Sequence, residues 1–405
     1  MTTILSDIGL NQTATGRQTA TIAEPSLACS GKRMFVTGNW FAARSTSAGA
    51  RWKFIDPYTE LPPAGAGFCC DQLVLYSKPW RLWVWLLQFA KNTTGNRIRV
   101  AVSSTGAPGS WTFWDTTPQD IDPNWRNVWL DYPDMLETDG NLLLSFNLFS
   151  TATDHWQRAV VLRFPMATLK ARGELQRQAW STDQFGSLRF ARGAGNVAYF
   201  ASLSYSAPQL QVFRWADNTS AVTQTSVAVS DWADRHYVSP LPDGGSWLNR
   251  LDARVTGGWM AEDRLGFAWS AAADADHPHP FIRVVRINRN NMALVDEPDL
   301  WSTDRAWAYP AMCPNQRGDV GVTAFCGGGG RFPTHAVGHL DQSSGTWEMT
   351  LGQASTHGPG NGAWGDYLDI RPDPSRTTYW LASGFVLQGG ASRNHIVPRV
   401  VLFKP

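Results

Sequence analysis

The chain repeats one short plan seven times, and this repeat limits its fold more than any other feature. Each copy has a polar or aromatic opening residue, a short strand, a tight turn and then a longer apolar strand. DYLDIRPDPSRTTYWLASGF, at 366–385, shows the plan, and DYPDMLETDGNLLLSFNLF, at 131–149, repeats it. The copies begin near residues 24, 71, 131, 186, 250, 308 and 366.

Further strand candidates follow most copies, such as NRIRVAVSS and SWTFWDT after the second copy. Four strands in each unit, at a period of roughly 45 to 65 residues, are typical of the blade of a propeller. The sequence therefore predicts an all-β, seven-bladed β-propeller with four-stranded antiparallel blades. We expect residues 1–405 to form one such domain, because the copies run through nearly the whole chain.

The two ends of the chain predict how the ring closes. The last copy ends with HIVPRVVLFKP, which is only its third strand, and residues 1–23 precede the first copy. We expect this N-terminal segment to supply the outer strand of the last blade. That arrangement would leave no unpaired strand edge at the closure.

Composition narrows the classes of function. The net charge of +1 gives no field that would attract nucleic acid or an anionic membrane. The sequence contains no run of about 18 apolar residues, which is the length needed to cross a bilayer. We expect a monomer with a small-molecule or saccharide ligand, cytoplasmic as given or secreted if a signal peptide has been removed. The 21 tryptophans, 36 glycines and 24 prolines suit many short strands and turns.

The five cysteines indicate no disulfide framework and no zinc spacing. Cys69 and Cys70 are adjacent, so we expect them not to pair with each other. No cofactor and no catalytic metal are expected, although a structural calcium ion in the channel remains open.

STSAGARW, at 45–52, fits the Asp-box turn except that Ser47 stands where the motif has Asp. The chain resembles the sialidase-like β-propeller superfamily, and within it a bacterial group of unassigned function with the words FCCDQ, WLDYPD, DADHPHP, STHGPGNGAWGDY and GFVLQGG. The resemblance implies that the first strand of each blade lines a central channel. It also implies that the opening residues and the loops between second and third strands meet on one face, around a funnel.

These positions supply the candidate site. Opening residues that occur in only one copy, and acids or phenols that start a blade, are the better catalytic candidates. At least five of the eight histidines fall in loops assigned to the same face. GGGGRFPTH, at 327–335, is interpreted as a flexible rim. DADHPHPF could present a catalytic imidazole, hold a metal or simply pack. The catalytic candidates are Glu24, Asp71, His277, Tyr309, Asp366 and Tyr367, and the substrate-binding candidates are Asn39, Trp40, Gln72, Tyr132, His155, Arg250, His279, Arg331, His335, His357, Trp364, Gln388 and Arg393.

Such a funnel fits carbohydrate chemistry. Paired carboxyl groups suit a glycoside hydrolase, whereas histidine and tyrosine suit a polysaccharide lyase that acts on a uronate. We expect one of these two enzymes, acting on a glycan or a uronate-containing saccharide. A non-catalytic, lectin-like propeller and a cofactor-independent biosynthetic enzyme are the alternatives.

Overall fold

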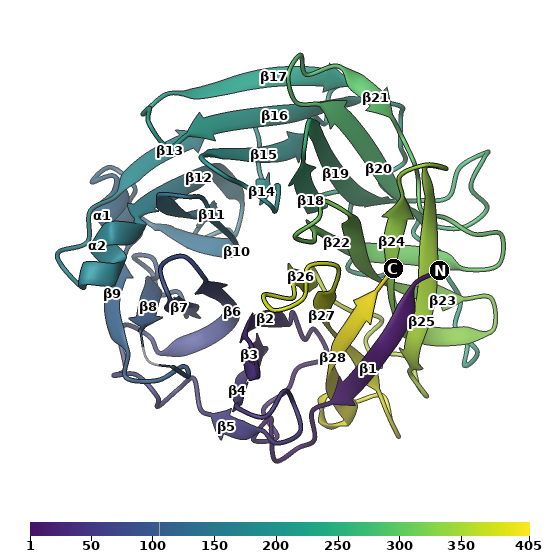
Figure 1. Cartoon of the computed structure of the whole chain (residues 1–405), viewed down its shortest axis with the longest axis horizontal. Helices are drawn as coiled ribbons and strands as arrows, with labels where there is room; N and C mark the ends of the chain where they lie inside the picture. The colour runs from purple at the N-terminus through teal and green to yellow at the C-terminus, as the bar shows by residue number, and fades with distance from the viewer. Residues whose placement is uncertain (105) are drawn as a thin grey trace.

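Seven four-stranded antiparallel sheets form a ring around a central channel in the computed structural model, which describes residues 1–104 and 106–405 (Figure 1). In six of the sheets the strands follow the order of the chain from the channel outwards, and in the seventh the outermost strand is the N-terminal strand of the chain. The predicted all-β, seven-bladed propeller is therefore confirmed.

The first four blades use consecutive strands. They are β2 (Ser26–Ser30), β3 (Arg33–Gly38), β4 (Phe41–Ser45) and β5 (Lys53–Ile55); β6 (Phe68–Ser77), β7 (Leu82–Phe89), β8 (Ile98–Ser103) and β9 (Thr112–Thr116); β10 (Val128–Glu137), β11 (Asn141–Ser150), β12 (Trp156–Pro165) and β13 (Gln178–Thr182); and β14 (Arg189–Phe190), β15 (Val197–Leu203), β16 (Gln209–Ala216) and β17 (Val222–Ala228).

The remaining three blades complete the ring. They are β18 (Val255–Ala261), β19 (Arg264–Ala271), β20 (Phe281–Asn288) and β21 (Leu294–Asp296); β22 (Ala306–Pro314), β23 (Val320–Gly328), β24 (Arg331–Asp341) and β25 (Thr346–Ala354); and β26 (Asp369–Pro372), β27 (Trp380–Leu387), β28 (Ile396–Lys404) and β1 (Thr3–Gly9).

The ring closes as the two ends of the sequence predict. Strand β1 pairs antiparallel with β28, from Thr3 opposite Lys404 to Gly9 opposite Arg399. Figure 1 shows β1, in purple, beside β28, in yellow. The last blade is thus built from both ends of the chain, and the backbone hydrogen bonds between β1 and β28 close the ring.

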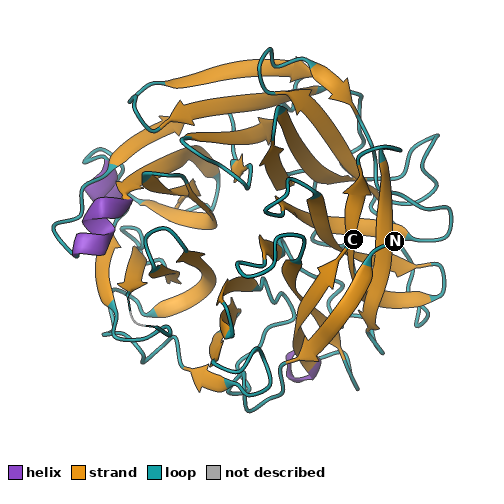
Figure 2. Cartoon of the chain, viewed as in Figure 1, coloured by secondary structure: helices purple, strands orange, loops and turns teal. Residues whose placement is uncertain are grey.

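Helical structure is short and lies at the outside of the ring (Figure 2). Helix α1 (Pro118–Ile121) begins at a capping box formed by Thr117 and Asp120, and helix α2 (Met166–Ala171) ends at Arg172. A 3-10 turn, η1 (Arg393–His395), precedes β28. In the described part of the chain, no helix is long and apolar enough to cross a membrane.

Large aromatic side chains fill the spaces between blades. Trp83 and Trp85 on β7 are fully buried and pack with Phe35 of the first blade. The ring of Phe35 meets that of Trp85 edge-on, with 5.3 Å between centroids. Each buried aromatic ring of this size stabilises the fold by about 2 to 3 kcal/mol or more. The tryptophan-rich composition therefore serves first to pack one blade against the next.

The motif Asp-Tyr-x-Asp opens the third and seventh blades, and its second aspartate joins neighbouring blades. Asp134 accepts a 2.9 Å hydrogen bond from the backbone N–H of Phe190 in the fourth blade. Asp369 accepts a 3.0 Å bond from the N–H of Leu27 in the first blade. Because these second aspartates fix the innermost strands, the Asp-Tyr pairs before them take defined positions at the mouth of the channel.

Candidate functional site

Three of the opening residues have an unusual backbone conformation. Glu24, Tyr132 and Tyr309 have φ values of +42°, +56° and +57°, and each is followed by proline. A left-handed φ costs a residue with a side chain about 1 to 2 kcal/mol, and such costs collect at functional sites. The ladders of β10 and β22 shift register at their tyrosines. These irregularities break the alternation of the strands and turn the tyrosines towards the axis.

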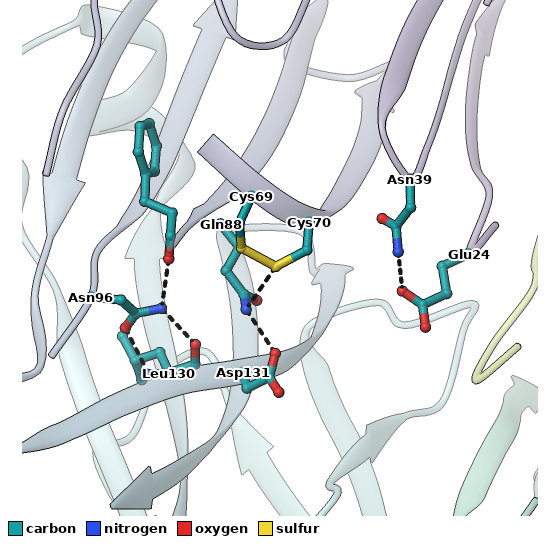
Figure 3. Close-up of a disulfide and its surroundings, with 9 residues drawn as sticks. Glu24, Asn39, Cys69, Cys70, Gln88, Asn96, Leu130 and Asp131 are labelled. Carbon is teal, nitrogen blue, oxygen red and sulfur yellow. Dashed lines mark hydrogen bonds between the residues drawn. A yellow bond between two sulfur atoms is a disulfide. The ribbon is translucent and has the colours of Figure 1, made fainter. Parts of the chain in front are cut away.

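Three carboxyl groups from the first, second and seventh blades meet at this mouth. Glu24, Asp71 and Asp366 are all buried, and the carboxyl of Glu24 lies within hydrogen-bonding reach of the other two. Asn39 Nδ2 donates a 2.7 Å hydrogen bond to Glu24 Oε2 (Figure 3). Four of the predicted site residues are therefore together.

The environments of these carboxyl groups set different pKa values. Burial raises the pKa of Glu24 well above its ordinary value, and the charges of Asp71 and Asp366 raise it further. Burial and the charge of Asp131 raise the pKa of Asp71 to about 7, although a hydrogen bond to Glu24 opposes that rise. Two carboxyl groups in contact cannot both ionise cheaply. The Glu24–Asp71 pair therefore holds a proton at neutral pH.

Asp366 stays ionised because two arginines face it. Arg250 donates to it through Nη2 at 2.6 Å and through Nε at 3.0 Å, and Arg254 Nη2 lies 3.6 Å away. Burial alone would raise the pKa of Asp366, but Arg254 and Arg250 outweigh it and hold that pKa below its usual value. The site therefore holds a protonated carboxyl pair beside an ionised carboxylate. Acid–base catalysis uses such a difference, because one group can give a proton while the other stays charged.

A buried cation lies among the tyrosines of the channel. Arg189 Nη2 donates a 3.1 Å hydrogen bond to the hydroxyl of Tyr132. Its guanidinium lies 5.3 Å from the ring of Tyr132 and 5.5 Å from that of Tyr367. Burial raises the pKa of both phenols, more than Arg189 lowers it. The tyrosines are therefore neutral hydrogen-bond donors at pH 7.

Several buried polar atoms around this channel have no hydrogen-bond partner among the described residues. Folded proteins leave few such atoms, and each calls for an explanation such as an ordered water or a ligand. Their gathering at one place indicates a binding site rich in donors and acceptors. They are Asn39 Oδ1, Gln88 Oε1, Arg189 Nε and Tyr309 Oη, whereas the hydroxyl of Tyr367 lies close enough to Asp71 to lower the pKa of that carboxyl through a hydrogen bond.

A long connection, residues 229–254 between β17 and β18, covers part of this mouth. Its Trp247 packs against Tyr309 and Trp364, with 6.3 Å between ring centroids in both cases. Its Asn249 N–H donates to the carbonyl of Gly362, in the segment that leads to the seventh blade. Connections of this length within compact domains are usually functional. Here the connection carries Arg250 across the channel to Asp366.

The wall of the second blade contains a disulfide between Cys69 and Cys70, whose Cα atoms are 3.7 Å apart (Figure 3). The expectation that these neighbours do not pair is wrong. Adjacent residues on a regular strand point to opposite faces, but the pairing of β6 with β7 shifts register between Phe68 and Gln72. That irregularity frees the two side chains from strict alternation.

A glutamine connects this disulfide to a fourth acid. Gln88 Nε2 donates a 2.7 Å hydrogen bond to Asp131 Oδ1 and lies 3.5 Å from Cys70 Sγ (Figure 3). Asp131 is only partly buried, so it is more accessible than Glu24 or Asp71. It raises the pKa of Asp71 through its charge.

The predicted histidines are not part of this group. His277 Nδ1 lies 2.8 Å from Asp274, and its ring stacks on Phe281 at 3.7 Å, so it packs within the fifth blade. His335 is buried inside strand β24, where it bonds to Thr323 at 2.7 Å. The interpretation of residues 327–335 as a flexible rim that presents His335 is therefore wrong: β23 and β24 extend through most of it.

The other histidines lie in separate loops. His155 is exposed and His279 is partly exposed, in the loops after β11 and β19. His357 bonds to the hydroxyl of Thr356 at 2.9 Å and stacks over Phe332. Although the sequence predicts several histidines on one face of the propeller, none of these candidates, all within the described residues, lies beside the carboxyl pair.

Some predicted binding residues have structural contacts instead. Gln72 Nε2 donates to the carbonyls of Gly38 and Phe41, which joins the first two blades. Trp364 is fully buried and stacks on Phe385 at 4.8 Å. Trp40 is partly exposed and packs against the apolar cluster of the same two blades.

The remaining candidates lie further along the rim. Gln388 Nε2 donates to the carbonyl of Ala354 at 2.6 Å. Arg331 is exposed at the start of β24, and Arg393 is exposed in η1. In the described chain, no ion pair joins either arginine to the carboxyl cluster.

Sequence reasoning missed Arg189 and Arg254. A signal for Arg254 was present, because Arg250, Asp252 and Arg254 alternate and so would point the same way from an extended segment. Arg189 lies three residues after Gly186, where the fourth copy of the repeat begins, and so near the start of an innermost strand. Among residues 1–104 and 106–405, no group of three or more histidine, cysteine, aspartate or glutamate side chains is placed to hold a metal ion.

Comparisons with known proteins agree on the fold. No family model matches the chain, and no curated protein is similar to it in sequence. Prolyl oligopeptidase B from Galerina marginata is 9% identical over 92% of this chain and 48% of its own, with a TM-score of 0.50. This chain therefore spans about half the length of that protein, and their likeness shows the fold alone.

Two glycosidases are also among the similar solved structures. The α-L-arabinofuranosidase Arb93A from Fusarium graminearum is 10% identical, over 100% of this chain and 98% of its own, with a TM-score of 0.47. The Hadza microbial sialidase Hz136 is 13% identical, over 78% and 65%, with a TM-score of 0.45. The seven four-stranded blades confirm the propeller fold that the resemblance implies.

Proposed function

We propose that the protein is a carbohydrate-active enzyme, a glycoside hydrolase, with its site at the mouth that Glu24, Asp71 and Asp366 share. The observation that carries this proposal is the buried carboxyl pair beside unpartnered polar atoms. Sugars present many hydroxyl groups, and the acceptor of Asn39 and the phenols of Tyr309 and Tyr367 complement them. The glycosidases among similar folds agree with this choice only at the level of architecture.

The carboxyl groups divide the roles of the reaction. Glu24 and Asp71 are in contact with each other, so they act as one unit that gives a proton to the departing oxygen. They are too close to each other to flank a glycosidic bond, which needs two carboxyl groups about 5 Å or more apart. The charge of Asp131 raises the pKa of Asp71, and the hydrogen bond from Gln88 orients the carboxyl group of Asp131. We assign Asp131 the second role, as base or nucleophile.

The arginines suit a substrate with an acidic group. Arg250 is 47% exposed, although its guanidinium is bound to Asp366. Arg254 is less exposed and interacts with both Asp252 and Asp366. A carboxylate on the sugar could take the outer side of this pair, since arginine binds carboxylates through two parallel hydrogen bonds.

A panel of neutral, uronate-containing and sialylated oligosaccharides tests the proposal. Release of reducing sugar is the result expected. Ultraviolet absorbance of an unsaturated uronate, without hydrolysis, would instead identify a lyase, in which a channel tyrosine is the base. Retention of a glycan without any product would identify a lectin, and the absence of both binding and product would contradict a carbohydrate function.

A further inference from the structure

A cavity of about 400 Å³ lies at the other end of the channel, away from Glu24 and Asp366. The last residues of β2, β6, β10, β22 and β26 line it, together with the turn after β14. In Figure 1 these innermost strands surround the centre of the ring. The volume is in the range of small-molecule sites. Nothing in the proposed reaction uses this cavity.

Most of its wall is apolar. Leu75 of the second blade, Leu136 of the third and Ala194 of the fourth contribute to it, beside several prolines of the turns. Apolar walls with a few polar groups are typical of sites that hold an organic molecule by its body and orient it by its head group.

Two guanidinium groups supply such polar groups. Arg192 Nη2 lies 2.8 Å from Asp134, and Arg371 Nε lies 3.1 Å from Asp369. Only 12% and 15% of their side chains are exposed, respectively. Arg192 also donates through Nη1 to the carbonyl of Met135, and Arg371 donates through Nη2 to that of Val74 at 3.4 Å. Among the described residues, these bonds leave Arg192 Nε and Arg371 Nη1 without a hydrogen-bond partner. Each arginine is therefore held in place through two of its nitrogens, while the third remains available as a donor.

The charges behind the cavity do not cancel. Asp134 is shared by two arginines, because Arg189 Nη1 also lies 3.2 Å from it. In ion pairs, Arg189, Arg192 and Arg371 share only Asp134 and Asp369, while Arg371 also acts through its charge on Glu137 in the cavity wall. An unmatched buried cation is costly, and an anionic ligand would relieve that cost.

The rim of the cavity carries one group of each sign. Lys78 is exposed and donates a 3.1 Å hydrogen bond to the carbonyl of Pro374. Glu137 accepts a hydrogen bond from the hydroxyl of Ser77, and burial raises the pKa of its carboxyl. The rim therefore does not offset the positive excess behind the cavity.

We propose that this cavity is a second binding site, for a small organic anion that has an apolar body and one carboxylate or phosphate. The anionic group meets Arg192 and Arg371, and the body packs against Leu75, Leu136 and Ala194. The site lies at the opposite end of the channel from the carboxyl cluster. It is independent of the function proposed for that cluster.

Calorimetric titration of the whole protein with phenylacetate, phenyl phosphate and phenylacetamide tests this inference. The three probes share a ring and differ in their head groups. We expect one or both anions to bind at least about tenfold more tightly than the neutral amide, because hydrogen bonds to charged groups are the stronger ones. The stronger of the two anions identifies the head group.

Variants locate the binding. Ala194→Leu places extra carbon atoms in the cavity and should abolish binding, whereas Lys78→Met should weaken it by a smaller factor. Arg371→Gln should lower affinity about tenfold or more. Arg371 also binds Asp369, so the first two variants keep the test valid if this one fails to fold. Lys170→Met, an exposed position on α2, is the control.

The inference is overturned by any of three results. These are no binding of any probe at millimolar concentrations, equal binding of the anions and the amide, or binding that Ala194→Leu leaves unchanged.

Discussion

Arg250 reaches from the connection between the fourth and fifth blades to Asp366 at the start of the seventh blade, where Nη2 and Oδ2 are 2.6 Å apart. The pair crosses the mouth of the channel and keeps Asp366 ionised. It also brings a half-exposed cation close enough to Glu24 for their charges to interact. This contact joins the long connection to the chemistry beneath it.

Removal of this arginine should affect function more than stability. We expect Arg250→Ala to raise the pKa of Asp366 and to lower turnover of an acidic saccharide about tenfold or more, since the ion pair is partly buried. The midpoint of thermal unfolding should fall only modestly, because Arg254 still faces Asp366. Arg264→Ala removes a comparable exposed arginine from its pair with Asp263 and is the control. Equal turnover by both variants would contradict a role for Arg250.

The pKa of Asp71 predicts a pH dependence of stability. In the folded protein Asp71 keeps its proton up to about pH 7, whereas in the unfolded chain it loses it near pH 4. The folded state therefore binds more protons between these values, so this contribution is full below about pH 4 and is lost as the pH rises through 7.

Asp71→Asn mimics the protonated carboxyl at every pH. We expect it to match the wild type in free energy of unfolding only below about pH 4 and to exceed it at pH 8. Denaturant unfolding at both values provides the measurement, with the exposed Asp183→Asn as control. If the difference between variant and wild type did not grow with pH, Asp71 would not be the protonated group.

The buried tyrosine hydroxyls of the channel predict a trade between stability and function. A buried hydroxyl without a partner destabilises a fold by about 1 to 3 kcal/mol. We expect Tyr309→Phe to leave the free energy of unfolding unchanged or to raise it by about 1 kcal/mol. Tyr367→Phe also loses a bond to Asp71, so its gain should be smaller, and both variants should weaken saccharide binding. Thermal unfolding and titration with the ligand of the panel would measure the two effects. Substantial destabilisation by Tyr309→Phe would show that the hydroxyl of Tyr309 has a structural partner.

Much of this architecture could be predicted from the sequence because each blade is a four-stranded sheet that needs the same order of strands and turns. The strand period, the turns and the missing last strand led to seven blades and to the pairing of β1 with β28. The acids and phenols at blade starts could be found for the same reason: Glu24, Asp71 and Tyr367 precede or begin innermost strands and therefore meet at one mouth.

The loops were harder, because their direction depends on packing that the repeat does not determine. The stacking of His277 on Phe281 turns it into its own blade, and the extension of β24 buries His335. The cysteine pair was missed because a local shift of register cannot be read from alternation. Arg189 was missed because its strand, β14, is only two residues long.

The disulfide predicts a count of thiols. Alkylation of the denatured, unreduced protein should label Cys29, Cys313 and Cys326, and reduction should expose two more sites. Mass spectrometry of the intact protein distinguishes three labels from five. Five labels before reduction would show that Cys69 and Cys70 are free.

The most direct test of the proposed chemistry is the rate of reducing-sugar release by Glu24→Gln, on the oligosaccharide of the panel that the wild type cleaves. Glutamine has the shape of the glutamate side chain, and its carbonyl oxygen can accept the hydrogen bond from Asn39. It has no carboxyl proton to give to the leaving group. The account predicts a fall of about a hundredfold or more, as is usual for loss of a general acid, with no change in the exposed Glu174→Gln. Release at the wild-type rate by Glu24→Gln would contradict it.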